Sequence, residues 1–203
     1  MASPSPSRLA PLQPSDWIRI GFSQLAREGI ESVRIEVLAR ELGVSKGSFY
    51  WHFKDRNALL EALLEHWVER QTLAVIRRVN SKEHSAETKL WRILELASLS
   101  PRAVHGADVE LAIRAWARRS PLARTAIDDV DTQRLSYLTQ LFIELGFPRT
   151  EAKLRSSLAH YYVLSAGLVK PESEAFLQRL TEFARELLTS KPSVGRQRGA
   201  RPR

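Results

Sequence analysis

The residues best suited to binding chemistry lie between Gly43 and Lys54, in the run G-V-S-K-G-S-F-Y-W-H-F-K. Phe49 and Phe53 are four residues apart and therefore share one face of a short helix. The opposite face carries hydroxyl, aromatic and cationic groups, which suit the phosphates and base edges of DNA. We expect contacts to DNA from Ser45, Lys46, Gly47, Ser48, Tyr50, Trp51, His52 and Lys54.

A helix-turn-helix would place these side chains. Residues 34–42 carry the apolar stripe of an amphipathic helix, and Gly43 follows as a residue that can end it. Ser45 is a favourable first cap for the next helix, and Val44 and Phe49 can form a hydrophobic staple around that cap. In a helix-turn-helix the second helix enters the major groove, while the first lies across the backbone.

The run L-A-R-E-L-G-V-S-K-G-S-F-Y-W-H-F-K-D-R-N-A-L-L resembles the N-terminal signature of the TetR (tetracycline-repressor-like) family of transcription regulators. The resemblance extends from about Trp17 to Leu64. It implies a DNA-binding domain of three helices, followed by a helical domain that forms a dimer and often encloses a small-molecule site. Val33 and Arg34 stand where many relatives carry Thr or Ser, so Arg34 is expected to contact a phosphate instead.

Composition supports a folded protein in a reducing compartment. The chain has 203 residues, 43% of them apolar, and it has no Cys, which excludes disulfides and thiolate chemistry. We see neither a signal peptide nor an apolar run long enough to span a membrane, and therefore expect a soluble, cytoplasmic protein. The net charge is +8, but residues 191–203 hold five Lys or Arg and no acid, so bulk charge does not locate a DNA surface.

The hydrophobic periodicity stays helical throughout, which predicts an all-α fold of about nine helices. We expect a disordered arm (1–14), a helix-turn-helix DNA-binding domain (15–54), a larger helical ligand-binding and dimerisation domain (55–190) and a basic disordered tail (191–203). Ser15 or Asp16 should cap the first helix, and Asp55 the long fourth one. The helices are predicted at residues 15–29, 34–42, 45–54, 55–79, 85–99, 107–119, 121–145, 150–168 and 173–189.

The last two predicted helices are the candidates for a homodimer interface. Small residues at Ala159, Ala166 and Gly167 would let a partner helix approach, and large apolar residues repeat at helical spacing. The expected interface residues are Leu158, Ser165, Phe176, Leu180, Phe183 and Leu187. The alternative is that this face covers the core of its own chain.

Aromatic and polar residues of the second domain are candidates for a ligand site, because sites in helical bundles combine aromatic walls with a few polar groups. They are Trp91, Trp116, Tyr137, Phe142, His160, Tyr161 and Tyr162. His160, beside two tyrosines, is the favoured polar cluster. Core packing is the alternative for each of them, and a largely apolar site would take a hydrophobic or aromatic ligand.

These features predict a sequence-specific, DNA-binding regulator: a repressor that binds a near-palindromic operator as a homodimer and is released by a small-molecule effector. The alternative is a non-specific nucleic-acid binder that acts through the Arg-rich tail.

We expect no enzyme, because the motifs of metalloproteases, phosphate-binding loops, dinucleotide sites and serine hydrolases are absent from the sequence. No cofactor and no metal site is expected either, since the five His show no metal-binding pair. Asp128, Asp129 and Asp131 form a small acidic cluster that could bind a cation, but we interpret it as a solvated helix face.

Overall fold

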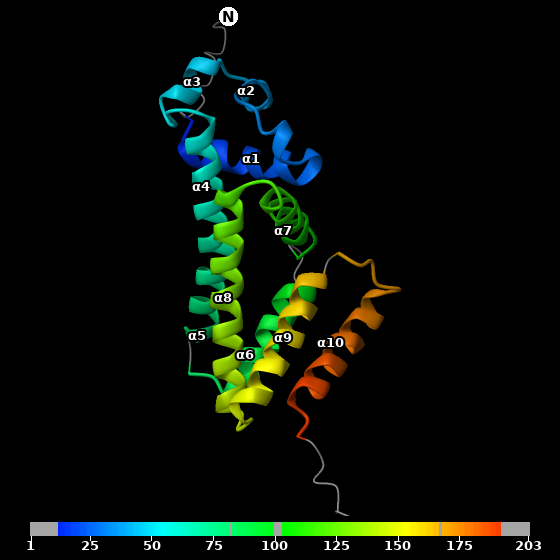
Figure 1. Cartoon of the computed structure of the whole chain (residues 1–203). Coiled ribbons are helices and arrows are strands. Elements are labelled where there is room, and N and C mark those ends of the chain that lie inside the picture. Colours follow the sequence, from blue (N-terminus) through cyan, green and yellow to red (C-terminus); the bar gives the residue numbers. More distant parts are fainter. Residues whose placement is uncertain (1–11, 82, 100–102, 167, 192–203) are drawn as a thin grey trace, which may run out of the picture.

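The computed structural model describes residues 12–81, 83–99, 103–166 and 168–191, and within them every regular element is helical (Figure 1). The elements are α1 (Pro14–Glu28), η1 (Ile30–Ser32, a 3₁₀ turn), α2 (Ile35–Leu42), α3 (Lys46–Tyr50), α4 (Arg56–Val68), η2 (Glu69–Leu73, a π-helical turn), α5 (Ala74–Asn80), α6 (Ala86–Ser98), α7 (Ala103–Ala117), α8 (Pro121–Glu144), α9 (Arg149–Ser165) and α10 (Glu174–Thr189). Most of the predicted arm and all but the first residue of the predicted tail lie outside these ranges. None of the described helices is both long and apolar enough to cross a membrane.

The all-α prediction is confirmed, and the long fourth helix is built from three of these elements. Asp55 caps it as predicted, because its Oδ1 accepts a hydrogen bond from the backbone N–H of Ala58 at 2.9 Å. Helix α4 then continues through the π-helical turn η2 into α5, which ends at Asn80. The π turn was not predicted. It places Thr72, which is 1% exposed, on the inner side of the continuous rod formed by α4, η2 and α5.

The start of α1 differs from the prediction. The residue that precedes the helix is Gln13, with Pro14 in the first turn, so neither Ser15 nor Asp16 is the cap. Asp16 instead reaches back, and its Oδ2 accepts the backbone N–H of Gln13 at 2.9 Å. A carboxylate in the first helical turn also interacts favourably with the helix dipole.

One hydrophobic core joins the helix-turn-helix to the top of the larger domain. Trp17 and Phe49 are fully buried, and their ring centroids are 5.2 Å apart in an edge-to-face arrangement. The same core includes residues of α4, α7 and α8, among them Trp67 and Trp116. The DNA-binding end is therefore packed directly on the second domain, and the predicted boundary at residue 54 remains a prediction.

A second core lies farther down the molecule, where α6, α8 and α9 pack together (Figure 1). Its fully buried residues include Leu90, Leu94 and Phe142. Helix α10 lies beside α9 and contributes Leu188 to this core. Most of the apolar face of α10 lies outside this core.

Candidate functional site

The turn between α2 and α3 has the geometry of a helix-turn-helix. Gly43 ends α2 in the left-handed region, with φ 69°, which a residue with a side chain rarely adopts. The N–H of Val44 then bonds to the carbonyl of Ala39 at 3.0 Å. Helix α3 is shorter than predicted and ends at Tyr50. The chain nevertheless keeps Phe53 in the core, where its ring stacks on Phe49 at 5.5 Å.

The outward face of α3 exposes the side chains that the sequence predicts for DNA contacts. Trp51 is 87% exposed and Tyr50 is 59% exposed, which is unusual for rings of this size. Figure 1 places α2 and α3 at one end of the molecule. Of the remaining predicted residues, Ser45, Lys46, Gly47 and Lys54 are exposed, and Ser48 and His52 are half-buried.

Ser45 precedes α3 as expected but makes no side-chain capping bond within the described structure. Its backbone carbonyl accepts the N–H of Ser48 at 3.1 Å. The predicted capping role of the side chain is therefore wrong. The hydroxyl stands exposed at the start of the helix, where backbone N–H groups also favour a phosphate.

Two basic residues differ in how they are held. Arg34 precedes α2, is exposed, and has an extended backbone that leaves its side chain at the edge of the helix-turn-helix. Arg56, which was not among the predicted site residues, is structural: its Nε donates to the carbonyl of Val33 at 2.6 Å, and its Nη2 donates to the carbonyl of Ile30 at 2.8 Å. These bonds tie the entry to α2 onto α4.

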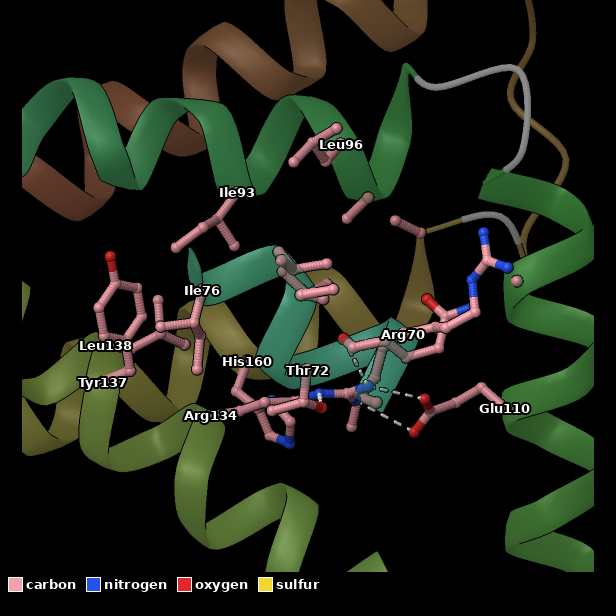
Figure 2. Close-up of a pocket in the computed structure, with 18 of the residues that line it drawn as sticks. Arg70, Thr72, Ile76, Ile93, Leu96, Glu110, Arg134, Tyr137, Leu138 and His160 are labelled. Atoms are coloured by element: carbon pink, nitrogen blue, oxygen red, sulfur yellow. Dashed lines mark hydrogen bonds and ion pairs between the residues drawn. The ribbon is translucent and has the colours of Figure 1, made fainter. Parts of the chain in front are cut away.

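A cavity of about 400 Å³ lies in the second domain, walled by η2, α5, α6, α7, α8 and α9 (Figure 2). Two of the seven predicted ligand residues, Tyr137 and His160, line it. The hydroxyl of Tyr137 donates to Oδ1 of Asn80 at 2.8 Å. His160 is only 3% exposed.

The other five predicted ligand residues lie elsewhere. Trp116 and Phe142 fill the upper and lower cores, and Trp91 carries the guanidinium of Arg185 over its ring at 4.9 Å. Tyr161 is 62% exposed. Aromatic residues of an amphipathic helix mostly point into a core, and the sequence alone does not separate a core from a cavity wall.

Tyr162 ties α10 to the bundle instead of lining the cavity. Its hydroxyl lies 2.8 Å from Oγ1 of Thr181 on α10 and 3.2 Å from Oγ of Ser98 on α6. Thr181 is fully buried. This polar contact ties α10 to both α6 and α9.

A network of charged residues, some of which line the cavity, was not predicted. Arg134 pairs with Glu110 at 3.1 Å, and its Nε donates to Oγ1 of Thr72 in the π turn at 3.1 Å (Figure 2). Glu110 also pairs with Arg114 at 2.7 Å. Three elements that are distant in sequence are thus bound together: η2, α7 and α8. The one sequence signal for this network is the four-residue spacing of Glu110 and Arg114 on one helix face.

Asp131 extends the network to α9. Its Oδ1 lies 2.6 Å from Arg114 and 3.1 Å from Nε2 of His160. Burial alone would raise the pKa of Asp131, but the hydrogen bonds from His160 and Arg114 hold that pKa well below its usual range. The solvated-face interpretation is therefore wrong for Asp131, although Asp128 and Asp129 are exposed. No group of three or more potential ligands in the described chain could hold a metal ion.

Four of the six predicted interface residues are large apolar side chains that stand exposed. They are Leu158 (58%), Leu180 (40%), Phe183 (61%) and Leu187 (60%). Ser165, the last residue of α9, is exposed as well, whereas Phe176 is half-buried. Leu154 (65%) and Tyr161 extend this surface along α9. We call these apolar residues of α9 and α10 the α9–α10 face.

The small residues that were expected beside this face do not all belong to it. Ala159 is fully buried in the core of its own chain and cannot admit a partner helix. Ala166 lines the cavity, and Gly167 lies outside the described residues.

Comparison with known proteins agrees with this architecture. The family model described as "Bacterial regulatory proteins, tetR family" matches residues 20–63. The tetracycline repressor protein class A from transposon 1721 of Escherichia coli is 41% identical over 54 residues, which is 27% of this chain and 25% of that protein. The HTH-type transcriptional regulator BetI of Cronobacter sakazakii is 28% identical over 150 residues, or 72% of this chain and 73% of that protein.

A solved structure shares the fold over most of the chain. The crystal structure of a transcriptional regulator from Rhodococcus sp. RHA1 has a TM-score of 0.67 and 20% sequence identity over 88% of this chain and 94% of that one. At this identity the likeness shows the fold alone. Residues 20–63, which hold the helix-turn-helix, thus match the tetR family of bacterial regulatory proteins, and the helical architecture of the chain is shared with the solved regulator.

Proposed function

We propose that this protein is a sequence-specific DNA-binding regulator that acts as a homodimer. The observation that carries the proposal is the outward face of α3, where Trp51 and Tyr50 stand exposed while Phe49 behind them is fully buried. A rigid helix that presents aromatic, hydroxyl and cationic groups is suited to the major groove. Arg34 and Lys54 would bind phosphates, and Lys46, Ser48 and Trp51 would read bases.

The α9–α10 face supports dimerisation. Large apolar side chains in one continuous surface mark an interface when they have no cover within their own chain. Two copies related by a two-fold axis would bury this face as four packed helices. The two α3 helices would then reach successive major grooves about 34–36 Å apart, which calls for a near-palindromic operator.

The cavity supports control by a small ligand with a hydrophobic body. It adjoins η2, and η2 belongs to the rod that begins with α4 beside the helix-turn-helix. A ligand that fits one arrangement of this rod better than another would change the spacing of the two recognition helices. We propose that ligand binding releases the protein from its operator, so that it acts as a repressor.

The test is selection of random duplex DNA at near-physiological salt by two forms of the protein, the full chain and a chain that ends at residue 190. We expect both to enrich one near-palindrome with half-sites about 10 base pairs apart. Retention of sequence preference by the shorter chain would support readout by α3.

Two results would count against this function. If neither form enriches a sequence, α3 does not read DNA unaided. If binding disappears with residues 191–203 and never depended on sequence, the protein is a non-specific nucleic-acid binder that acts through its tail.

A further inference from the structure

The chemistry of the cavity wall indicates what kind of ligand it accepts. Most of the wall is aliphatic, and the space exists because several positions carry little or no side chain, including Ala74, Ala97, Gly106 and Ala107. The larger aliphatic residues are Val75, Ile76, Ile93, Leu96, Leu138, Val163 and Leu164. At about 400 Å³ the cavity is at the small end of the range of roughly 300–1,000 Å³ for ligand sites.

Positively charged residues outnumber negatively charged ones at the cavity wall. Three arginines line it, Arg70, Arg78 and Arg134, but among the described lining residues Glu110 is the single acid. Glu110 is already bound to Arg134, at 3.1 Å. Arg70 and Arg78 have no ion-pair partner within the described structure, so the wall carries two uncompensated positive charges.

A cationic ligand has little to hold it here. Quaternary ammonium groups are bound by cages of aromatic rings. Of the described residues that line the cavity, Tyr137 alone carries a Phe-, Tyr- or Trp-type ring, and its hydroxyl is bonded to Asn80. Excess positive charge around the site would also repel a cation.

We propose that the cavity binds an aliphatic carboxylate, with its anionic end at Arg70 and its hydrocarbon chain along the aliphatic wall. Arg134 is held in place by Glu110 and Thr72, whereas Arg70 is free to form a charge-assisted pair. Figure 2 shows Arg70 and Glu110 on the same side of the cavity, next to α7. This inference rests on the proposed function, because it names the ligand class of the same regulatory site.

The position of Arg70 gives such a ligand a route to the DNA-binding end. Arg70 lies in the π turn η2, directly between α4 and α5. Thr72, two residues later in that turn, accepts a hydrogen bond from Arg134. A carboxylate at Arg70 would therefore act on the helix that continues to the recognition domain.

The experiment is calorimetric titration of the full chain with three probes of equal chain length: octanoate, octanamide and octyltrimethylammonium. We expect octanoate to bind at least about tenfold more tightly than octanamide, because the carboxylate forms a charge-assisted pair with Arg70, and the ammonium probe to bind least. Equal affinity for octanoate and octanamide, tighter binding of the ammonium probe, or binding of none of the three would overturn the proposal.

Two substitutions test whether the carboxylate of the ligand binds at Arg70. Arg70→Gln should bring the affinity for octanoate close to that for octanamide, while leaving octanamide binding unchanged. Arg77→Gln is the matched control, because Arg77 is on the same rod, pairs with Glu69 on the outside and does not line the cavity. Retention of the octanoate preference in Arg70→Gln would refute the role of Arg70.

These readouts are independent of DNA. If octanoate fails to bind but the protein still selects a palindrome, the ligand class is wrong and the regulator proposal stands. If octanoate binds through Arg70 but no DNA sequence is enriched, the proposed function fails while the assigned ligand chemistry remains.

Discussion

Nζ of Lys46, the first residue of the recognition helix, lies 2.8 Å from Oε1 of Glu36 in the preceding helix. The hydrogen bond from Lys46 lowers the pKa of the Glu36 carboxyl. One of the cations expected to meet DNA is thus partly neutralised within its own domain. Binding of DNA through Lys46 has to break this pair or share it with a phosphate.

We therefore expect Glu36→Gln to bind operator DNA more tightly than the wild type, since it removes both the competitor for Lys46 and a negative charge near phosphates. Glu182→Gln, the same charge change at an exposed position of α10, controls for net charge. The lowered pKa keeps Glu36 ionised above the ordinary carboxyl range of about 4.3. The difference should therefore be constant at neutral pH and shrink in acid. Weaker binding by Glu36→Gln would mean that Glu36 orients Lys46 for contact.

Trp51→Ala should separate recognition from folding. Because the side chain is 87% exposed, its removal should change the free energy of unfolding by less than about 0.5 kcal/mol. The sequence enriched from random DNA should nevertheless change. Phe49→Ala, two residues earlier, should cost about 3–5 kcal/mol because the ring is fully buried. Urea denaturation measures the stability of each variant, and selection of random DNA by the folded variants measures their sequence preference. An unchanged sequence preference in Trp51→Ala would exclude a base contact by Trp51.

The helix-turn-helix was predictable because its signals are local. Gly43 in the left-handed region and Phe49 with Phe53 on one face follow from spacing alone. The Asp55 cap is equally local. By contrast, periodicity does not decide which side of α1 is buried most deeply: Trp17 and Leu25 are fully buried, whereas Ile18 and Phe22 are half-buried. Apolar residues occur on both sides of this helix, and only its packing against α4 and α7 selects one of them.

The cavity and its charged network were not predictable for a different reason. Asp131, Arg114 and His160 come from three helices, and their meeting depends on how those helices cross. The cavity itself arises where small residues of separate helices coincide, such as Ala97 and Gly106. The predicted ligand residues were mostly large aromatics, but only Tyr137 and His160 line the cavity, whereas Trp116 and Phe142 fill the two cores.

Asp131→Asn should destabilise the protein in a way that depends on pH. The change leaves Arg114 and His160 without their carboxylate, and we expect a cost of about 1–3 kcal/mol at neutral pH. The pKa of Asp131 is lowered in the folded state, so its contribution is complete above the unfolded carboxyl pKa and is lost as pH falls toward the folded value. Thermal unfolding measured from pH 7 to pH 3 should show that the variant loses less stability in acid than the wild type does. An equal loss of stability in both proteins would contradict this.

Phe183→Glu should convert a dimer into a folded monomer. The ring is 61% exposed within the chain, so the substitution should scarcely affect the fold of one protomer, but a charge there would be buried across a two-fold interface. Sedimentation velocity reports the change in mass, and circular dichroism checks the helix content. Gln178→Glu, an exposed polar position of the same helix, is the matched control. An unchanged dimer in Phe183→Glu would place the interface elsewhere.

Thr72→Val should weaken communication between the cavity and the DNA-binding end more than it weakens either binding event. The substitution keeps the volume of a side chain that is 1% exposed, but it removes the acceptor for Nε of Arg134. Loss of that bond weakens the tie between the π turn and α8, which then depends on the 3.4 Å hydrogen bond from Arg134 to the carbonyl of Gln71, and we expect a stability cost of about 1–2 kcal/mol. The measurement is the affinity for operator DNA with and without a cavity ligand. The ratio of these two affinities gives the coupling free energy, which is about 1–3 kcal/mol in typical allosteric proteins. That ratio should fall toward one in the variant while ligand affinity stays within a few-fold of the wild type, because Thr72 holds the rod that joins the two sites. If the ratio of operator affinities in Thr72→Val equals that of the wild type, the signal reaches α4 by another route.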